Sequence, residues 1–429
     1  MIGSEPKALS AEHQEALDLM ERGDGHLFIT GRAGTGKSTL LQLFAGTTRK
    51  KHVVLAPTGI AALNVGGQTI HSFFGFPPKL LTQEEIYRRK NYRMFLNLDI
   101  IIIDEISMVR ADMMDNIDWF LRVNRGRNIP FGGVRMILFG DLFQLPPVIG
   151  NKVEAQFLRE RYDSPYFFAA SVWQKESTFD MIELEEVYRQ DERRFINILD
   201  NIRTNEVDEY VIMDLNERYT EQIDESKFII TLSSRNAIVN EINRRHLAQL
   251  SGEEFTYLAK VSGNFPPSSY PAELGLKLKE GTQVMFTKND PEKRFVNGTL
   301  GIAKHLLPDK IIVEVILEDG SNVEIEVPLL IWEIQKYKQE GTKISSEIVG
   351  SFEQFPLKMA WTITIHKSQG KTFDKVIINM GAKGAFEHGQ TYVALSRCRT
   401  LEGVVLKKKL TPRDIMVDDR IVEYYEQNF

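Results

Sequence analysis

A glycine-rich segment between an apolar run and a helix-compatible run is the strongest constraint on what this chain can fold into. The segment reads GRAGTGKS from Gly31 to Ser38 and fits the pattern G-x-x-x-x-G-K-[ST]. Glycines let backbone N–H groups curl around phosphate oxygens, and the start of the following helix adds a partial positive charge. The sequence therefore predicts a phosphate-binding loop between a buried strand and a helix.

Each residue type in this loop suits one part of a bound nucleotide. Lys37 is placed to reach the phosphates, and Ser38 is placed to ligate Mg²⁺ through its hydroxyl oxygen. An accidental glycine-rich turn is the alternative, but the apolar run from His26 to Ile29 fits the strand that precedes such a loop. We expect nucleotide contacts from Gly34, Thr35, Gly36, Lys37, Ser38 and Thr39.

Composition places the chain among water-soluble globular proteins. Its 429 residues are 42% apolar and 26% charged, which is the usual balance. No apolar run approaches membrane-spanning length, and early acidic residues argue against a secretory or transit segment. The single cysteine, Cys398, excludes intramolecular disulfides and is expected to be a small buried residue. We therefore expect a cytoplasmic protein without membrane contact. The net charge of −6 leaves room only for a local basic channel.

Short apolar runs recur through the first part of the chain. Val53–Ala56, Asp99–Ile103 and Met136–Phe139 resemble the run before the glycine-rich loop, and each ends in a polar or glycine-rich turn. Strands that alternate with helical stretches indicate a parallel sheet with helices on both faces and ligands at the carboxyl ends of the strands. The sequence therefore predicts an α/β fold with its motifs at one edge of the sheet.

A second set of strand-like runs predicts a second sheet, formed by Phe228–Leu232, Gln283–Phe286, Val376–Asn379 and Val404–Leu406. Between them, Ile311–Leu317 and Val323–Val327 are β-rich and meet at Asp319-Gly320, a hairpin signal. We expect residues 294–352 to form a small β-rich insertion in the second α/β domain. A shorter insertion is expected at residues 76–97, which include Arg88, Arg89, Lys90 and Arg93.

An acidic pair follows the most apolar run of the chain. Four isoleucines, Ile100–Ile103, lead directly into Asp104 and Glu105. Asp104 is suited to hold Mg²⁺ through its water shell, and Glu105 is suited to polarise the attacking water. A solvated acidic strand end is the alternative, but the preceding phosphate loop favours hydrolysis. The guanine-reading pattern N-K-x-D is absent, which weakens a GTPase interpretation.

Three further groups suit phosphoryl transfer. Gln144, after the run that ends at Phe139, can place an amide against the γ-phosphate, although an ordinary turn is equally compatible. Arg189 in Tyr188-Arg189-Gln190 and Arg397 in Ser396-Arg397-Cys398 are candidate cations for the developing charge. An isolated arginine is usually a surface ion-pair partner, but a well-placed one is worth roughly 10³–10⁵ in rate.

These residues together resemble the petite-integration-frequency (Pif) family of superfamily-one DNA helicases and its RecD-like relatives. The matching segments stand in the family's order and cover nearly the whole chain: GRAGTGKS at Gly31, APTGIAA at Ala56, GQTIHSFF at Gly67, IIDEISM at Ile102, GDLFQLPPV at Gly140, YRQ at Tyr188, TIHKSQGKTFD at Thr364 and YVALSRCRT at Tyr392. The stretch from Met114 to Gly133, with Arg122, Arg125 and Pro130-Phe131-Gly132-Gly133, adds to the match. The chain looks like a bare helicase core of bacterial type.

The resemblance implies two RecA-like domains with ATP between them. It assigns residues 1–182 to the first domain, residues 183–293 and 353–429 to the second, and residues 294–352 to a β-barrel-like insertion. It also implies that Gln14 contacts adenine, that Arg189 and Arg397 act as arginine fingers, and that Gly370 lies near the γ-phosphate. ATP and Mg²⁺ are the implied cofactors, with Lys37, Glu105 and Gln144 in the roles given above.

The resemblance also implies a set of DNA-facing residues, namely Thr58, Asn64, His71, Phe73, Pro147, Thr364 and His366. Small polar groups on loops suit phosphate contacts, and aromatic faces suit base stacking worth roughly 1–3 kcal/mol per base. Phe73 is equally compatible with a place in the core. Backbone and stacking contacts carry little sequence information, so we expect weak sequence preference.

The implied function is ATP-driven movement on single-stranded DNA in the 5′-to-3′ direction, with unwinding of tailed duplexes. Residues 76–97 are the candidate wedge, and the β-rich insertion is the candidate clamp. The resemblance adds G-quadruplexes and RNA–DNA hybrids as candidate substrates, and we expect a monomer in the free state. Two alternatives remain, a nucleotide-gated DNA-loading ATPase and a single-strand translocase that does not unwind.

Overall fold

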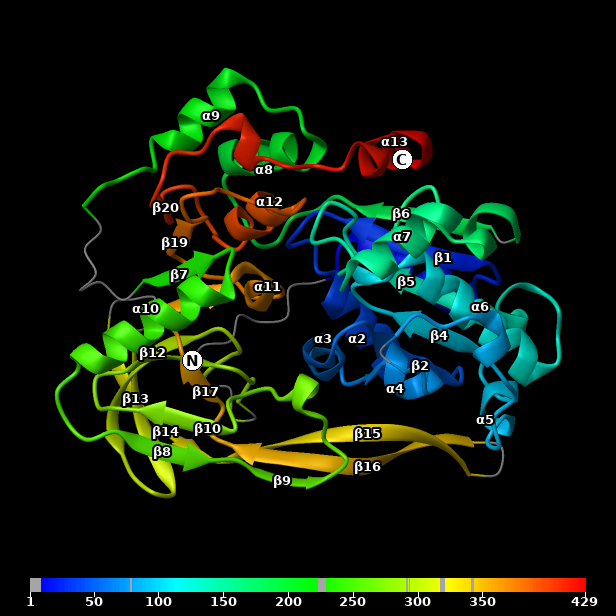
Figure 1. Ribbon diagram of the computed structural model, residues 1–429, viewed down its shortest axis with the longest axis horizontal. Coiled ribbons are helices and arrows are strands. Elements are labelled where there is room, and N and C mark those ends of the chain that lie inside the picture. Colours follow the sequence, from blue (N-terminus) through cyan, green and yellow to red (C-terminus); the bar gives the residue numbers. More distant parts are fainter. Residues whose placement is uncertain are drawn as a thin grey trace. The chain divides into compact units, whose positions relative to one another are not determined.

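The computed structural model describes residues 9–77, 79–176, 178–222, 229–290, 292, 294–316, 321–340 and 343–429 (Figure 1). These residues divide into two units that interleave along the chain. Unit 1 comprises Arg189–Glu333 and Gly350–Val417, and unit 2 comprises Ala8–Tyr188, Ile334–Val349 and Asp418–Phe429. The first unit boundary, after Tyr188, falls later than the domain boundary predicted at residue 182.

A six-stranded parallel sheet forms the centre of unit 2, with the strand order β3-β2-β4-β5-β1-β6. Its strands are β1 (His26–Gly31), β2 (His52–Ala56), β3 (Gln68–Thr69), β4 (Ile100–Ile103), β5 (Arg135–Phe139) and β6 (Phe179–Leu184). The four isoleucines of β4 are at most 1% exposed, as expected for a parallel strand covered on both faces. Because β5 lies between β1 and β4, the loops after these three strands adjoin one another.

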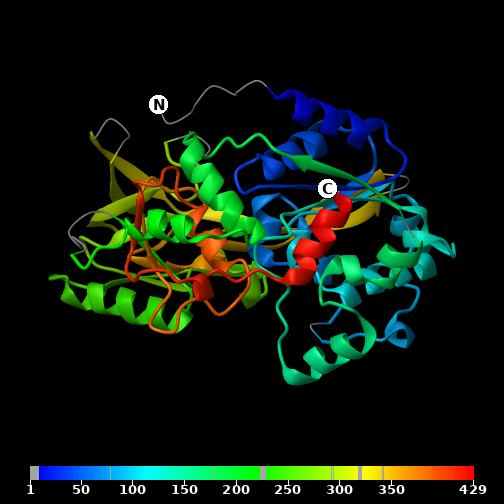
Figure 2. The same cartoon turned by 90° about the horizontal axis from the view of Figure 1, so that it is seen from above.

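The helices of unit 2 are α1 (Ala11–Arg22), α2 (Lys37–Thr47), α3 (Gly59–Asn64), α4 (Ile70–Phe74), α5 (Arg93–Leu96), α6 (Ala111–Arg125), α7 (Lys152–Arg161) and α13 (Asp419–Asn428). Helix α1 packs beside α2 and against the edge strand β6 (Figure 2). Helix α13 also packs on this unit, because Tyr424 stacks on Phe168 with ring centroids 4.1 Å apart. Phe429, just after α13, meets Phe28 of β1 edge-on.

The candidate wedge, residues 76–97, contains a short 3₁₀ turn (Gln83–Glu85) and α5 in its described part. Two arginine–aromatic pairs stiffen it: the Arg88 guanidinium lies 3.7 Å from the centre of the Tyr92 ring, and that of Arg89 lies 4.8 Å from the centre of the Tyr87 ring. Arg89 also donates to the carbonyl oxygens of Phe74 and Gly75, at 3.1 and 2.9 Å. Tyr87 remains 61% exposed, so an aromatic face projects from this insertion.

Unit 1 contains a four-stranded parallel sheet with the order β18-β7-β19-β20. Its strands are β7 (Ile230–Ser233), β18 (Thr362–Thr364), β19 (Val376–Asn379) and β20 (Val404–Leu406). The helices of this unit are α8 (Arg193–Thr204), α9 (Glu209–Asn216), α10 (Asn236–Gln249), α11 (Ile365–Ser368) and α12 (Gln390–Leu395). Two parallel sheets with flanking helices confirm the predicted α/β fold class. Phe228, the predicted start of β7, lies outside the described residues.

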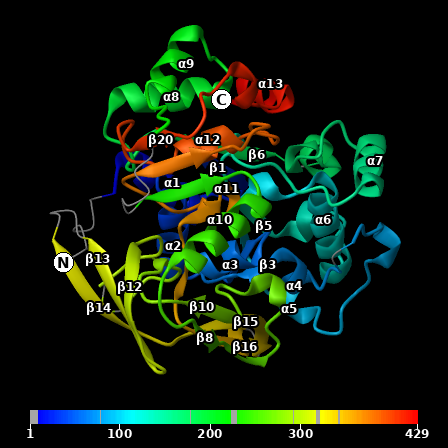
Figure 3. The same ribbon diagram turned by 60° about the vertical axis from the view of Figure 1, so that its left-hand side comes forward.

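A separate antiparallel sheet in unit 1 has the order β14-β13-β12-β11-β17, and β12 to β14 lie side by side in Figure 3. The β strands of this part are β8 (Phe255–Leu258), β9 (Lys260–Gly263), β10 (Gly275–Leu278), β11 (Gln283–Phe286), β12 (Leu300–Leu306), β13 (Lys310–Ile316), β14 (Asn322–Pro328) and β17 (Leu357–Met359). The buried side chains of β8 and β10 share its core with those of β11 to β14. The hairpin signal Asp319-Gly320 and the predicted strand end Leu317 lie outside the described residues.

One strand assignment from the sequence is wrong. Gln283–Phe286 was expected in the second parallel sheet, but β11 pairs antiparallel with β12 and β17. All four residues of β11 are buried, and such a run does not reveal which sheet it joins. The β-rich part therefore begins near Phe255, ahead of the predicted start at residue 294.

A long hairpin, β15 (Leu330–Glu340) and β16 (Lys343–Gln354), forms a three-stranded sheet with β9. The distal part of this hairpin, residues 334–349, groups with unit 2. Tyr337 there accepts a hydrogen bond on its hydroxyl from the backbone N–H of Val54 at 3.1 Å. The Tyr337 ring lies edge-on to Phe73, with centroids 5.9 Å apart. No helix in the described ranges is both long and apolar enough to cross a bilayer.

Candidate active site

The phosphate loop follows β1 and ends at the start of α2, as its sequence predicts. Three of its glycines, Gly31, Gly34 and Gly36, have φ angles of 146°, 96° and 79°. A Cβ atom on Gly31 would lie 2.4 Å from the carbonyl oxygen of Leu184, so the close approach of β6 also excludes a side chain there. Gly36 occupies the N-cap position of α2. The loop backbone therefore requires glycine at these positions.

The Lys37 ammonium lies over the loop that it follows. Its Nζ donates to the carbonyl oxygens of Gly31 and Arg32, at 2.7 and 2.8 Å, and lies 3.4 Å from Thr35 Oγ1. Thr35 is fully buried and donates its own hydroxyl to Arg32. The charge is thus held at the mouth of the loop, where phosphate oxygens would replace carbonyl oxygens as acceptors.

Asp104 and Ser38 converge although they come from different strand ends. The Ser38 hydroxyl hydrogen-bonds to the Asp104 carboxylate, which is 6% exposed. Burial raises the pKa of Asp104 to about 7, the charge of Glu105 adds to the increase, and Lys37 opposes it. A buried carboxylate beside a hydroxyl oxygen is the hard donor pair that Mg²⁺ prefers. The residues present therefore fit the expected ion.

Glu105 has an unusual backbone for a residue with a side chain. Its φ and ψ angles are 50° and 46°, in the left-handed region. Such a conformation is disfavoured for residues other than glycine and persists where the surroundings impose it, often at functional sites. Glu105 follows β4 directly, so this turn sets the direction of its carboxylate relative to that of Asp104.

Gln144 is held by an aspartate that the sequence analysis did not single out. Asp141 is fully buried, and its Oδ2 accepts a hydrogen bond from Gln144 Nε2 at 3.1 Å. Its Oδ1 accepts from the backbone N–H of Phe143 at 3.2 Å. Gln144 itself is 8% exposed. The signal for Asp141 was its place three residues before Gln144, at the end of a buried strand.

The two candidate arginines meet within unit 1. Arg189 donates to the carbonyl oxygen of Ser396 at 3.0 Å, and Gln190 donates to the same oxygen at 3.1 Å. Arg397 is 1% exposed and donates to Val393 O and Ser396 Oγ, at 3.0 and 2.9 Å. Burial and then the charge of Arg397 lower the pKa of Arg189 well below its usual value. Two like charges gathered in one buried place suit an anionic ligand.

Other predicted positions of unit 1 lie around α11. Thr364 is its N-cap and accepts from the N–H of Lys367 at 3.3 Å, while His366 Nε2 lies 3.2 Å from a Glu387 carboxylate oxygen. Gly370 has a φ of 73° with open space beside its Cα, so the backbone conformation rather than crowding favours glycine. The nucleotide-site residues thus form two sets. Lys37, Ser38, Asp104, Glu105 and Gln144 belong to unit 2, and Arg189, Gly370 and Arg397 belong to unit 1.

The DNA-facing predictions in unit 2 differ in exposure. Thr58 and Asn64 are exposed at the two ends of α3, and the Thr58 hydroxyl caps that helix by accepting from the N–H of Ala61. His71 is half-buried, and burial lowers its pKa. Pro147 is buried, as is Phe73 at 8% exposure. Phe73 packs against Phe74, Phe95 and Tyr337, which favours a core role for it.

Gln14, the predicted adenine contact, lies in the first turn of α1. It is exposed, and its amide donates to Asp18 one turn further along α1, at 3.3 Å. Its neighbour His13 is 4% exposed and is the α1 residue that faces the loop. The adenine contact of Gln14 stays a prediction, and His13 is a further residue of the same sequence pattern that lies beside the loop.

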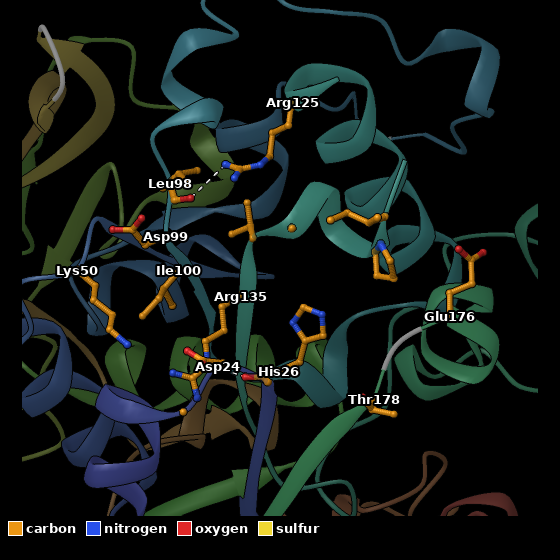
Figure 4. A pocket seen from close by; sticks show the side chains of 16 residues that line it. Asp24, His26, Lys50, Leu98, Asp99, Ile100, Arg125, Arg135, Glu176 and Thr178 are labelled. Atoms are coloured by element: carbon orange, nitrogen blue, oxygen red, sulfur yellow. Dashed lines mark hydrogen bonds between the residues drawn. The ribbon is translucent and has the colours of Figure 1, made fainter. Parts of the chain in front are cut away.

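A cavity of about 720 Å³ lies at the amino ends of the unit 2 strands, the opposite edge from the phosphate loop. Figure 4 shows Arg125 and Arg135 in its wall. Arg135 donates to the carbonyl oxygens of Leu19, Met20 and Gly25, and Arg125 donates to those of Phe95, Leu98 and Gly132. These bonds give both arginines a structural role, and the cavity is separate from the candidate active site.

Comparisons with known proteins agree with this geometry. A family model described as PIF1-like helicase matches residues 8–213. The ATP-dependent DNA helicase Pif1 of Bdellovibrio bacteriovorus is 34% identical over 98% of this chain and 92% of its own length. The chain spans about two thirds of the vertebrate relatives that it matches, 65% of one and 64% of another.

Two solved structures of Bacteroides Pif1 are also similar, each 39% identical over 98% of this chain and 97% of that chain. The complex with ADP-AlF4 has a TM-score of 0.89, and the complex with ADP-AlF3 and single-stranded DNA has a TM-score of 0.71. Sequence and fold thus agree over nearly the entire length. This chain belongs to the PIF1-like helicase family.

Proposed function

We propose that this protein is an ATP-dependent DNA helicase that moves 5′-to-3′ on single-stranded DNA and separates tailed duplexes. The observation that carries the proposal is the convergence of Lys37, Ser38, Asp104 and Glu105 at the carboxyl ends of β1 and β4, the two strands that flank β5. Such an arrangement is what phosphoryl transfer to water needs. Membership of the PIF1-like helicase family directs this chemistry to DNA, because its relatives are named ATP-dependent DNA helicases.

In the proposed reaction, each residue of unit 2 has one task. Lys37 neutralises phosphate charge, and Glu105 accepts a proton from the attacking water. Gln144, held by Asp141, orients that water or the γ-phosphate. Ser38 and Asp104 would hold Mg²⁺, which when bound offsets negative charge on the phosphates.

Arg189 and Arg397 are the proposed arginine fingers. Arg189 donates to the carbonyl oxygen of Ser396, and Arg397 donates to Val393 O and Ser396 Oγ, so both guanidinium groups are oriented by the same turn of unit 1. Oriented cations of this kind can stabilise charge that develops in a transition state. ATP hydrolysis would then require both units, which is how a motor couples turnover to movement.

The proposed DNA path uses Thr58, Asn64, His71, Pro147, Thr364 and His366, with residues 76–97 as the wedge. The exposed ring of Tyr87 supports the wedge assignment, since an aromatic face can stack on a base pair at the fork. Separating DNA costs on average about 1.4 kcal/mol per base-pair step, so some group must hold the opened pair apart.

Strand displacement tests the proposal. We expect unwinding of a duplex with a 5′ single-stranded tail, in the presence of ATP and Mg²⁺, and no unwinding of a 3′-tailed duplex. Lys37→Ala should reduce ATP turnover by at least about 10²-fold while circular dichroism stays unchanged. Preference for the 3′ tail would overturn the polarity. Normal turnover in the Lys37 variant would overturn the phosphate-site assignment.

Tyr87→Ala separates unwinding from translocation. We expect it to slow displacement of the 5′-tailed duplex and to leave ATP turnover on single-stranded DNA within about twofold. If ATPase on single strands runs normally in the unmodified protein but no duplex is displaced, the chain is a translocase and not a helicase.

A further inference from the structure

Three chain segments that are distant in sequence meet at the phosphate loop of unit 2. They are the beginning of α1, the loop itself and the residues that follow β6. His13 of α1 contacts all three segments and is 4% exposed. Its Nδ1 lies 2.8 Å from Ser10 Oγ and 3.3 Å from the Tyr188 hydroxyl. The two rings are tilted against each other with centroids 5.4 Å apart.

The rings of His13 and Tyr188 both lie next to Gly36, the N-cap residue of α2. A Cβ atom on Gly36 would lie 3.0 Å from His13 Nε2 and 3.8 Å from Tyr188 Cδ2. The backbone N–H of Tyr188 also donates to the carbonyl oxygen of Gly34 at 3.0 Å. His13 and Tyr188 therefore support the two glycines whose left-handed backbone shapes the loop.

The segment that leads to Tyr188 is fixed at a second point on α1. Glu12 Oε2 accepts hydrogen bonds from the backbone N–H groups of Glu185 and Glu186, at 3.1 and 3.2 Å. These charge-assisted bonds hold the chain as it leaves β6. The residue after Tyr188 is Arg189, the first residue of that part of unit 1 and a proposed arginine finger.

We propose that His13 and Tyr188 are positioning residues that fix the phosphate loop and link its shape to Arg189. A shift of the loop on nucleotide binding would move the Tyr188 backbone through Gly34, and Arg189 is one peptide bond away. Displacement of a catalytic group by about 1 Å can cost about 10²-fold in rate, so a short link of this kind is sufficient. This inference rests on the proposed ATP site.

The roles of the two side chains differ. His13 supplies a buried ring beside Gly36, and its Nδ1 lies within hydrogen-bond distance of the hydroxyl groups of Ser10 and Tyr188. Tyr188 supplies a backbone N–H for Gly34 that no side-chain substitution removes. His13 variants should therefore disturb the loop, and loss of the Tyr188 hydroxyl should loosen only its contact with α1.

Steady-state ATP hydrolysis with saturating single-stranded DNA tests the proposal. We expect His13→Ala to raise KM for ATP about tenfold and to lower kcat about tenfold. Tyr188→Phe should lower kcat about twofold to fivefold with little change in KM. Glu15→Gln, an exposed neighbour on α1, is the matched control and should leave both constants unchanged. His13→Gln, which keeps a polar side chain of similar reach, should recover part of the lost kcat.

A double-mutant cycle with Arg189→Ala tests whether His13 acts through Arg189 or only supports the phosphate loop. If the link exists, His13→Ala should lower kcat much less in the Arg189→Ala background than in the unmodified protein. If the kcat losses of the two single variants multiply in the double variant, the link is overturned. Unchanged KM and kcat in folded His13→Ala, judged by its circular dichroism, would overturn the positioning role. If His13→Ala does not fold, His13→Gln takes its place in the same cycle. Failure of the ATP-site assignment itself would instead appear as normal turnover in Lys37→Ala.

Discussion

Asp141 holds the Gln144 amide from inside the protein, with Oδ2 3.1 Å from Nε2 and no exposed surface on the aspartate. A buried acceptor of this kind restricts the side-chain rotation of Gln144, because leaving it unpaired would be costly. If Gln144 contacts the γ-phosphate as proposed, its orientation depends on a residue that needs no contact with the nucleotide.

Asp141→Asn should lower kcat for ATP hydrolysis by about tenfold or more and leave KM nearly unchanged. The substitution keeps the shape but replaces one carboxylate oxygen by a donor that cannot accept from Gln144. Steady-state kinetics with single-stranded DNA measure the effect. Gln144→Ala should produce no additional loss when combined with it, and an additive loss would show that the two residues act separately.

Arg397→Lys should lower DNA-stimulated ATP hydrolysis by roughly 10³-fold and preserve nucleotide binding. Lysine keeps the charge but cannot make the paired contacts with Val393 O and Ser396 Oγ that aim the guanidinium. Binding of a fluorescent ADP analogue serves as the control. Wild-type turnover in this variant would remove Arg397 from the catalytic set.

His26 should make stability depend on pH. Burial, and then the charge of Arg135, lowers the pKa of His26 to about 4 from 6.5. Its Nδ1 accepts from the N–H of Met136 at 3.0 Å, which requires the neutral ring. Below pH 6.5 the unfolded chain binds the proton more tightly, so stability is lost as the pH falls toward 4.

The loss attributable to His26 should reach up to about 3 kcal/mol at pH 4, measured by urea unfolding. In His26→Gln this part of the pH dependence should disappear. The exposed His305→Gln is the control and should keep it. An identical pH profile in His26→Gln and the unmodified protein would contradict the assignment.

Phe73→Ala should destabilise the protein by about 3–5 kcal/mol, as expected for a large side chain removed from a core. Phe73 is 8% exposed among Phe74, Phe95 and Tyr337. Phe73→Leu should cost much less and keep DNA affinity. If unfolding is unaffected and only DNA binding weakens, by about 1–3 kcal/mol, Phe73 stacks on a base instead.

The phosphate loop, the acidic pair and four of the six strands of the unit 2 sheet were predictable because each carries a local signal. Glycines with fixed spacing and a run of four isoleucines determine their own structure with little help from other segments. The two edge strands were missed, because β3 has only two residues and β6 is mostly half-buried, with acidic side chains among its apolar ones. Strand β6 forms because β1 offers it a partner, which a single sequence does not display.

The other differences between prediction and structure arise from contacts that a local sequence pattern does not determine. β11 reads as a buried strand of any sheet, and only its contacts with β12 and β17 assign it. The place of His13 beside Gly36 depended on the direction in which α1 faces the loop. Asp141 gained its role only from the position of Gln144. These are relations in space between residues that no local pattern reports.

The packing of α13 on Phe168 and Phe28 has a consequence for biosynthesis. Residues translated some 240 positions after β6 complete the aromatic packing of unit 2, since Tyr424 stacks on Phe168 and its hydroxyl contacts the sulfur of Met181 in β6. Until the ribosome has passed this helix, the nascent sheet keeps apolar rings exposed to water and to chaperones. The complete aromatic packing of this unit therefore forms only after the synthesis of a segment that supplies none of the candidate nucleotide-site residues.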